Sequence, residues 1–247
     1  MKILGIIPAR YASTRFPAKA LVDIAGQTMI ERVYRQAKKS KSITKIIVAT
    51  DHSKIFDHVI SFGGQACMTS ESHASGTDRC FEVLTKENDQ FDYVINIQGD
   101  EPFIAPEQID LLASLLDGKA ELATLSKKIE DSEQLFNSHI VKIVSSADGK
   151  ALYFSRSPIP HVRNVAPSEW LNRHSFYKHV GMYAYRADIL KQITMLNISS
   201  LEKAESLEQL RWLENGYSIN VAETEFETIG IDTPEDLEKA IKYLSKK

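Results

Sequence analysis

Residues 3–19 read ILGIIPARYASTRFPAK and contain the two features on which the predicted fold depends. Residues 3–7 form a continuous apolar run, which is typical of a strand buried on both faces of a parallel sheet. The polar stretch that follows concentrates Arg10, Arg15 and Lys19 among hydroxyl side chains. Ligands of open α/β sheets bind beyond the carboxyl ends of the strands, so this stretch predicts a binding loop for an anion.

Two further strand–helix units follow this opening. The apolar runs at residues 46–49 and 93–98 again have the length and composition of buried strands. After each of the three strands, apolar residues recur at helical spacing. They are Met29, Ile30, Val33 and Ala37, then Ile55, Val59 and Phe62, and finally Ile109, Leu112 and Leu116. Three such units predict a doubly wound, mostly parallel α/β sheet.

The middle of the chain has a different pattern. Four short apolar segments predict a smaller, antiparallel, strand-rich extension over about residues 122–185. The segments are residues 122–125, 141–144, 151–155 and 180–185. Prolines within residues 157–174 predict a long irregular loop. We expect two more helices near the carboxyl terminus, one ending at Asn215-Gly216 and one starting at Pro234 and packing back on the sheet.

The composition excludes several classes of protein. The 247 residues carry 30 basic and 33 acidic side chains, and this net charge of −3 argues against a nucleic-acid binder that depends on a basic field. No apolar run reaches the ~18–20 residues that cross a bilayer, and no targeting segment is recognisable. Cys67 and Cys80 suit a reducing compartment. We therefore expect a cytoplasmic protein that binds neither nucleic acid nor membrane.

The cationic loop after the first strand has the composition of a triphosphate site. It is not a Walker loop, because the glycines and the Gly-Lys-Ser/Thr ending are absent. A solvated basic loop is the alternative, and the position after the first strand argues against it. The missing Gly-x-Gly-x-x-Gly disfavours a nicotinamide-dependent oxidoreductase. A non-catalytic nucleotide-binding regulator stays open as a second class of function.

Two aspartates are candidate Mg²⁺ ligands. Asp100 follows the third strand directly after Gly99, and Asp232 follows a short expected strand at residues 228–231. Asp100 could instead be a turn former, and Asp232 a helix cap. Thr233 could supply the cap oxygen by itself, which would leave Asp232 for the metal. A regulator would have little use for both carboxylates.

Several motifs of this chain together closely resemble the 3-deoxy-manno-octulosonate (Kdo) cytidylyltransferase family. They are IPARYASTRFP at 7–17, IVATD at 47–51, CMTS at 67–70, HASGTDR at 73–79, NIQGDEP at 96–102, LYFSR at 152–156, HVGMY at 179–183, LEQLR at 207–211 and GIDTPEDLE at 230–238. The resemblance spans nearly the whole chain. It implies one nucleotidyltransferase domain over residues 1–247, with the extension serving sugar binding and dimerisation.

The resemblance also implies a reaction and a set of site residues. CMP would pass from CTP to the eight-carbon sugar acid Kdo, with release of pyrophosphate, to give the activated sugar for lipopolysaccharide biosynthesis. The CTP site would use Ala9, Arg10, Ser13, Arg15 and Lys19, and Mg²⁺ would lie on Asp100 and Asp232. The sugar pocket would use Arg79, Gln98, Arg156, His179, Tyr183, Glu208 and Gln209. The catalytic residues would be Arg10, Lys19, Asp100 and Asp232, in a homodimer.

The residues of the sugar pocket also have simpler interpretations. His179 and Tyr183 alternate with apolar residues and could lie at the edge of the core. Arg156 could anchor a loop through an ion pair. Glu208 and Gln209 could lie on solvated surface or, with Trp212, at a subunit interface.

The loop departs from the family pattern at two positions. The family usually has Pro-Gly-Lys-Pro-Leu where this chain has Pro17-Ala18-Lys19-Ala20-Leu21. If residue 18 needs a positive φ, alanine costs about 1 kcal/mol there, and losing the proline reduces preorganisation by a similar amount. Neither change removes a charged ligand. A sugar related to Kdo, such as its 8-amino analogue, is therefore an alternative substrate.

Overall fold

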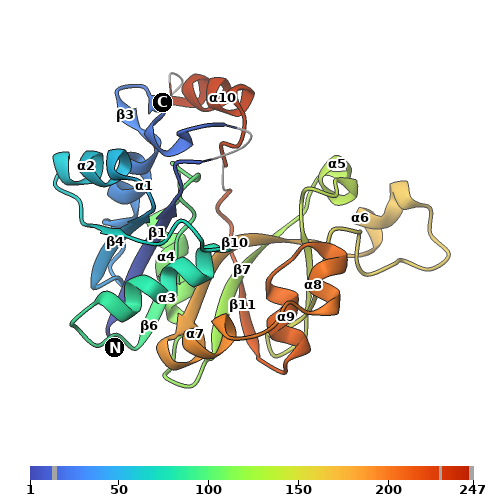
Figure 1. Ribbon diagram of the computed structural model, residues 1–247. Coiled ribbons are helices and arrows are strands. Elements are labelled where there is room, and N and C mark those ends of the chain that lie inside the picture. Colours follow the sequence, from blue (N-terminus) through green and yellow to red (C-terminus); the bar gives the residue numbers. More distant parts are fainter. Residues whose placement is uncertain (13–15, 228–229, 245–247) are drawn as a thin grey trace. The chain divides into compact units, whose positions relative to one another are not determined.

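The computed structural model describes residues 1–12, 16–227 and 230–244 of this chain. The chain forms two compact units (Figure 1). The first consists of Met1–Ala113 together with Thr228–Lys247, and the second of Ser114–Glu227. The segments near both termini therefore belong to one unit, and the expected extension at residues 122–185 lies within the other. No helix in the described residues is both long enough and apolar enough to cross a bilayer.

Parallel strands form the main sheet of the first unit (Figure 1). They are β1 (Ile3–Ala9), β4 (Lys45–Thr50), β5 (Ala66–Met68) and β6 (Tyr93–Asn96), in the spatial order β6-β1-β4-β5. Ala9 at the end of β1 is the register partner of Thr50 at the end of β4, so these strands end at a common edge. β6 is shorter than the strand expected at residues 93–98, although the amide of Ile97 still donates to the carbonyl of Ile6 (2.8 Å).

The predicted helices follow β1, β4 and β6, and a further helix, which was not predicted, follows β5. They are α1 (Met29–Ala37), α2 (Ser53–Ser61), α3 (Gly76–Lys86) and α4 (Pro106–Ser114). The expected apolar stripe of α1 is buried along its length. At the start of α3 the hydroxyl of Ser75 accepts from the amide of Asp78, and the Asp78 carboxylate accepts from the amide of Ser75. This capping box fixes the helix start inside the motif at residues 73–79.

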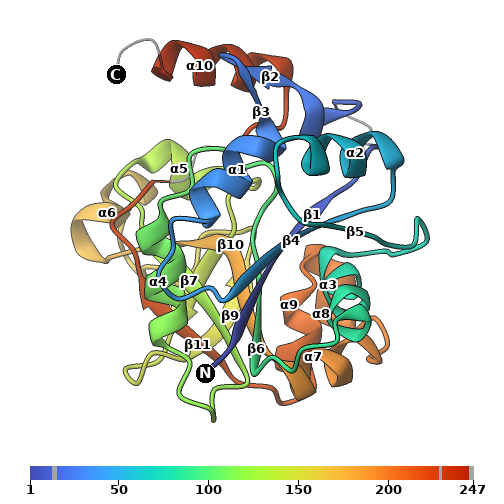
Figure 2. The same cartoon turned by 90° about the vertical axis from the view of Figure 1, so that its left-hand side faces the viewer.

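The last helix packs on a short hairpin. The strands β2 (Asp23–Ile24) and β3 (Gln27–Thr28) are joined by Ala25 and Gly26, which both have positive φ (52° and 84°). α10 (Pro234–Leu244) lies against β2 (Figure 2). A buried cluster unites Ile24, Met29, Ile231 and Ala240. The prediction that this helix packs back on the main sheet is therefore wrong, because its apolar residues cover the hairpin instead.

β7 (Leu122–Lys128) lies at the centre of the sheet in the second unit. It pairs antiparallel with β10 (Tyr177–Arg186) and parallel with β11 (Ile219–Glu223). β8 (Lys142–Ser145) pairs antiparallel with β10 and with β9 (Ala151–Ser155). The expected strands at residues 122–125, 141–144, 151–155 and 180–185 are therefore all present. A register shift in β10 between Val180 and Tyr183 marks a bulge.

Short helices complete the second unit. They are α5 (Ser132–Phe136), α7 (Ala187–Thr194), α8 (Ser200–Glu205) and α9 (Gln209–Glu214). The stretch at residues 157–174 is not irregular throughout, since it contains the 3-10 turn η2 (Pro167–Glu169) and α6 (Trp170–Arg173). Pro167 stands at the start of the turn, where proline is tolerated. Trp170 drives the local order by packing with Ile129, Leu135 and Phe176.

Candidate functional site

Lys19 bonds to two carboxylates in the first unit. Its Nζ lies 2.8 Å from Oδ2 of Asp100 and 2.8 Å from Oδ1 of Asp232. Burial by itself would lower the pKa of Lys19, but the charges of these two carboxylates and their hydrogen bonds outweigh burial and raise the pKa above its usual value. Lys19 is therefore a permanent positive charge. The side chains of Lys19, Asp100 and Asp232 are 17, 33 and 45% exposed, so a ligand from solvent can reach all three.

Two backbone contacts set the position of Asp100. A Cβ atom at residue 99 would lie 2.6 Å from the carbonyl oxygen of Pro8, so Gly99 lets the chain after β6 approach the end of β1. The amide of Ile231 donates to the carbonyl of Asp100 (3.0 Å), which brings Asp232 alongside. Of the strand expected at residues 228–231, the first two residues lie outside the described chain, and Gly230 and Ile231 are not in a strand.

Thr233 caps α10. Its hydroxyl accepts from the amide of Asp236 (3.2 Å), and the Asp236 carboxylate accepts from the amide of Thr233 (3.1 Å). The carboxylate of Asp232 bonds to Lys19 instead. These contacts argue against Asp232 serving only as a helix cap.

The carboxylates of Asp100 and Asp232 have the chemistry of Mg²⁺ ligands but could supply only part of a coordination shell. No group of three or more His, Cys, Asp or Glu side chains in residues 1–12, 16–227 and 230–244 is arranged around a metal position. The two aspartates nevertheless turn one oxygen each toward the same cation, the ammonium of Lys19. Mg²⁺ takes oxygen ligands and commonly combines one or two carboxylates with water and substrate phosphates.

Sequence reasoning missed a third carboxyl group, Glu101. Its Oε2 atom is buried and has no hydrogen-bond partner within the described residues. Burial, together with the charge of Asp100, raises the pKa of Glu101 to about 8. Glu101 is thus mostly protonated at neutral pH and adds little negative charge beside Asp100. Its place in the motif at residues 96–102 is the one signal that could have found it.

The predicted nucleotide loop begins at the end of β1 and ends at the 3-10 turn η1 (Lys19–Leu21). Ala9 is buried, whereas Arg10 is exposed and its Nη2 donates to the carbonyl of Ala74 (3.4 Å). Ser13 and Arg15 lie outside the described residues, and their roles stay predictions. Ala18 has φ 55° and ψ 26°, the left-handed conformation that favours glycine. The positive φ considered for residue 18 is therefore present.

Residues at the end of β4 hold this loop, and sequence reasoning did not assign them to the site. The amide of Tyr11 donates to Oδ1 of Asp51 (3.1 Å). The ring of Tyr11 stacks on the ring of His52, with centroids 3.8 Å apart and an interplanar angle of 15°. The signal was the position of Asp51 and His52 directly after a buried parallel strand.

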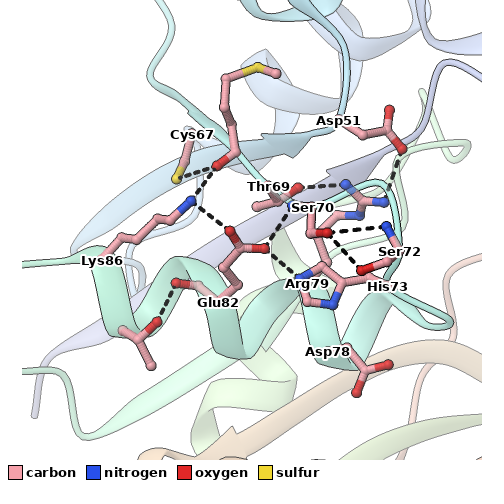
Figure 3. A network of polar contacts seen from close by, with 12 residues as sticks. Asp51, Cys67, Thr69, Ser70, Ser72, His73, Asp78, Arg79, Glu82 and Lys86 are labelled. Atoms are coloured by element: carbon pink, nitrogen blue, oxygen red, sulfur yellow. Dashed lines mark hydrogen bonds and ion pairs between the residues drawn. The ribbon is translucent and has the colours of Figure 1, made fainter.

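Arg79 is fully buried and bonds inside the protein. Its Nη2 donates to Asp51 (3.0 Å) and its Nη1 to the hydroxyl of Thr69 (Figure 3). These contacts argue against its predicted role in the sugar pocket, because a ligand in solvent does not reach a side chain that is 0% exposed. Gln98 is partly buried just after β6, and its carbonyl accepts from the amide of Glu101 (3.4 Å).

Glu82 ties the loop at residues 69–75 to α3 (Figure 3). Its carboxylate accepts from the amide of Ser70 (2.8 Å) and from Lys86 (2.6 Å), and it contacts the ring of His73. Burial alone would raise the pKa of Glu82, but these hydrogen bonds outweigh burial and lower it to about 2. The ionised carboxylate of Glu82 thus holds the loop at residues 69–75, whose Ala74 carbonyl accepts from Arg10.

His179 and Tyr183 meet at the bulge of β10. Four residues on a regular strand span about 13 Å, whereas these two ring centroids are 5.0 Å apart. The hydroxyl of Thr124 donates to the carbonyl of Met182 (2.8 Å), so it accepts from Nε2–H of His179 (2.9 Å). Burial lowers the pKa of His179 to about 3, and the ring is neutral. The buried hydroxyl of Tyr183 has no hydrogen-bond partner within the described chain.

Arg156 anchors the end of α8. Its Nε, Nη1 and Nη2 donate to the backbone carbonyls of Glu205 (2.7 Å), Ser138 (3.2 Å) and Ser206 (3.3 Å). The Glu205 carboxylate meanwhile accepts from the amide of Arg156 (2.9 Å). The guanidinium therefore anchors this segment through backbone carbonyls, whereas the anchor considered for Arg156 was an ion pair.

Glu208 and Gln209 stand at the start of α9. Glu208 is partly exposed and lies 3.6 Å from Arg211, whereas Gln209 is buried. The interpretation that Gln209 lies on solvated surface is therefore wrong. Trp212 is 1% exposed and packs edge-on against the ring of Tyr183, with centroids 5.0 Å apart, so it belongs to the core and not to an interface. Its indole N–H is also buried without a hydrogen-bond partner in the described residues.

Comparisons with known proteins place this geometry in a family. A sequence model described as cytidylyltransferase matches residues 4–229. The 3-deoxy-manno-octulosonate cytidylyltransferase of Cytophaga hutchinsonii is 58% identical over 96% of this chain and 95% of its own. The protein of that name from Parabacteroides distasonis is 54% identical over 100% of both chains.

Solved structures agree with the sequence comparison. The structure of a CMP:2-keto-3-deoxy-manno-octonic acid synthetase complexed with CTP matches with a TM-score of 0.92 and 41% identity, covering 100% of this chain and 99% of that one. The predicted α/β fold class is confirmed by this match. The chain therefore belongs to the cytidylyltransferase family, among its 3-deoxy-manno-octulosonate cytidylyltransferases.

Proposed function

We propose that this protein transfers CMP from CTP to Kdo and releases pyrophosphate. The observation that carries this proposal is the contact of Lys19 with Asp100 and Asp232, in a chain that belongs to this family. The anomeric hydroxyl of Kdo attacks the α-phosphorus of CTP. A new oxygen–phosphorus bond forms as the bond to the bridging oxygen breaks, pyrophosphate leaves with its electron pair, and the hydroxyl proton passes to solvent. Catalysis of this step is mainly positioning and charge neutralisation.

The charges of the first unit suit the nucleotide. Arg10 and Lys19 place cations at the carboxyl edge of the sheet, where they bind the phosphates of CTP. Asp100 and Asp232 are the residues that would hold Mg²⁺. Bound there, the ion would neutralise phosphate charge and lower the pKa of the attacking hydroxyl. Ser13 and Arg15 complete the loop on the strength of the family resemblance alone.

The polar groups of the second unit suit a sugar acid. The neutral imidazole of His179 and the unpaired hydroxyl of Tyr183 are groups that hydrogen-bond sugar hydroxyls. Arg156 keeps a positive charge that can pair with the sugar carboxylate. Glu208 and Gln209 supply further acceptors and donors near Tyr183. Gln98 lies in the first unit, and its role in sugar binding rests on the resemblance alone.

Three wider features are also part of the proposal. The protein acts in the cytoplasm, which the two unlinked thiols of Cys67 and Cys80 support. It is a homodimer, as the family resemblance implies. Its product serves lipopolysaccharide biosynthesis.

Pyrophosphate release tests the proposed reaction. The purified protein is incubated with CTP and Mg²⁺, and separately with Kdo, its 8-amino analogue or sialic acid. We expect release with Kdo and a product of the mass of CMP-Kdo. Release with the 8-amino analogue alone would instead establish the alternative substrate, and CTP binding without release on any sugar would favour a nucleotide-binding regulator.

A further inference from the structure

A buried ion pair lies under the nucleotide loop. Arg79 of α3 is 0% exposed, and its partner Asp51 is 10% exposed. The Nη1 atom of Arg79 donates to the hydroxyl of Thr69, which donates in turn to the carbonyl of Thr50 (3.1 Å). Both terminal nitrogens of Arg79 therefore act on the end of β4 (Figure 3). Its Nε is buried without a hydrogen-bond partner in the described residues, so this arrangement carries a desolvation cost.

Asp51 transmits this arrangement to the loop. One carboxylate oxygen, Oδ2, accepts from Arg79, and the other, Oδ1, accepts from the amide of Tyr11 (3.1 Å). His52, the neighbour of Asp51, also holds Tyr11, because the two rings stack. The Nδ1 atom of His52 accepts from the amide of Lys54 (3.1 Å), which fixes the imidazole at the start of α2.

Tyr11 then connects to the phosphate-binding lysine. Its carbonyl accepts from the amide of Ala18 (3.1 Å), which closes the loop on itself. Ala18 is in the left-handed conformation, and Lys19 follows it directly. Hydrogen bonds and the intervening covalent backbone therefore connect Arg79 through Asp51, Tyr11 and Ala18 to Lys19.

We infer that Asp51 and Arg79 are positioning residues for CTP. The ion pair sets the orientation of the Asp51 carboxylate, and that carboxylate sets the position of Tyr11. This inference rests on the proposed function. Arg79 is fully buried, so its effect on CTP passes through Asp51 and Tyr11. A shift of the loop by about 1 Å can reduce catalysis by roughly a hundredfold, which makes a rigid support worth its desolvation cost.

The same two elements carry a matched control. Lys45 at the start of β4 pairs with Glu87 directly after α3, so this ion pair links the same strand and helix at the opposite end of β4. Its side chains are 29 and 16% exposed. Loss of this pair weakens the packing of α3 on β4 without touching the loop.

The experiment compares Asp51→Asn, Arg79→Met, the double variant and Glu87→Gln. Melting temperature, kcat, and KM for CTP and for Kdo are measured for each folded protein. We expect Asp51→Asn and Arg79→Met to raise KM for CTP roughly tenfold or more, with KM for Kdo near the parent value. The double variant regains melting temperature relative to Asp51→Asn, because no buried charge is left unpaired, but it keeps the raised KM for CTP. Glu87→Gln leaves both KM values near those of the parent.

His52→Asn provides a variant outside the buried pair. Asparagine can still cap α2, whereas the ring that stacks on Tyr11 is lost. We expect KM for CTP to rise severalfold with the melting temperature nearly unchanged.

The readouts separate positioning from simple stabilisation. The inference would be overturned if the melting temperatures of Asp51→Asn, Arg79→Met and their double variant fell while KM for CTP stayed at the parent value. Equal rises in KM for CTP and for Kdo would also overturn it. Failure of the proposed function would appear differently, as a parent protein that makes no product from CTP and Kdo.

Discussion

The amide of Ile231 donates a hydrogen bond to the carbonyl oxygen of Asp100, over a distance of 3.0 Å. This contact joins the chain just before α10 to the chain just after β6. It places the next residue, Asp232, where its carboxylate and that of Asp100 bond the same Lys19 ammonium. Two carboxylates far apart in sequence thus become one charged group at the edge of a sheet.

Ala18→Gly should stabilise the protein. Ala18 holds φ 55°, which costs an alanine about 1 kcal/mol relative to glycine. Ala25→Gly is the control, because Ala25 has a similar φ of 52° in the hairpin turn of β2 and β3. Urea unfolding should show a gain of up to about 1 kcal/mol for both variants, and only Ala18→Gly should change KM for CTP. Equal KM values in both variants would mean that the backbone at residue 18 does not shape the nucleotide site.

Lys19→Met and Arg10→Met should have different effects on stability. Each removes a charged phosphate contact worth roughly 1.5–3 kcal/mol, so both should lower kcat/KM for CTP by about tenfold or more. Lys19→Met also leaves Asp100 and Asp232 without their shared cation and should change the melting temperature. Arg10 is exposed, and its hydrogen bond to the carbonyl of Ala74 is long (3.4 Å), so its variant should melt like the parent. If kcat/KM for CTP is unchanged in both variants, the loop is a solvated turn.

Glu82→Gln should reduce the sensitivity of the fold to acid. The pKa of Glu82 is about 2 in the folded protein against 4.5 ordinarily, so the unfolded chain takes up the proton first as pH falls. The stabilisation by ionised Glu82 is complete above pH 4.5 and is lost as pH falls toward 2, and it is on the order of 2 kcal/mol at a side chain that is 21% exposed.

The measurement for Glu82 is urea unfolding between pH 2 and pH 6. The parent should lose more unfolding free energy over this window than Glu82→Gln does. Glu71→Gln is the control, because Glu71 is exposed on the same loop. Parallel curves for the parent and Glu82→Gln would show that the contacts of Glu82 with Ser70, His73 and Lys86 contribute nothing in solution.

The parallel units of the fold were predictable, because strands buried on both faces leave continuous apolar runs and each is followed by a helical stripe. The packing partner of α10 was not predictable. An amphipathic pattern indicates that Leu237 and Ala240 face the core, but it does not show whether they cover a hairpin or the main sheet. The order within residues 157–174 comes from Trp170 and its tertiary partners, which local proline signals do not encode.

Some residues of the candidate site were also predictable from the sequence, and others were not. The positions of Lys19 and Asp100 after buried strands, and of Asp232 after a strand that was expected but is not found at Gly230 and Ile231, predicted these three residues, and the structure brings them together. The burial of Arg79 and Glu101 could not be predicted, because charged residue types are expected at the surface. The contact of His179 with Tyr183 depends on a bulge, and a bulge changes the spacing of side chains without any signal in a strand pattern.

CTP should be the preferred nucleotide. The family resemblance implies a base site built from backbone groups near Ala9 and Arg10, and a site of that kind would be too small for a purine. Turnover with CTP, ATP and GTP at equal concentration is the test, with Kdo as acceptor. Comparable rates with ATP and CTP would contradict a pyrimidine-sized site.

Turnover of the Asp100→Asn, Asp232→Asn and double variants tests most directly the central claim, that these two carboxylates act as one site. Glu235→Gln serves as the control, because Glu235 is exposed in the first turn of α10. We predict that each single substitution lowers kcat by orders of magnitude with the fold intact, and that the double variant loses far less than the sum of the two losses in activation free energy. Independent, additive losses, or full activity of the parent without Mg²⁺, would contradict the shared site.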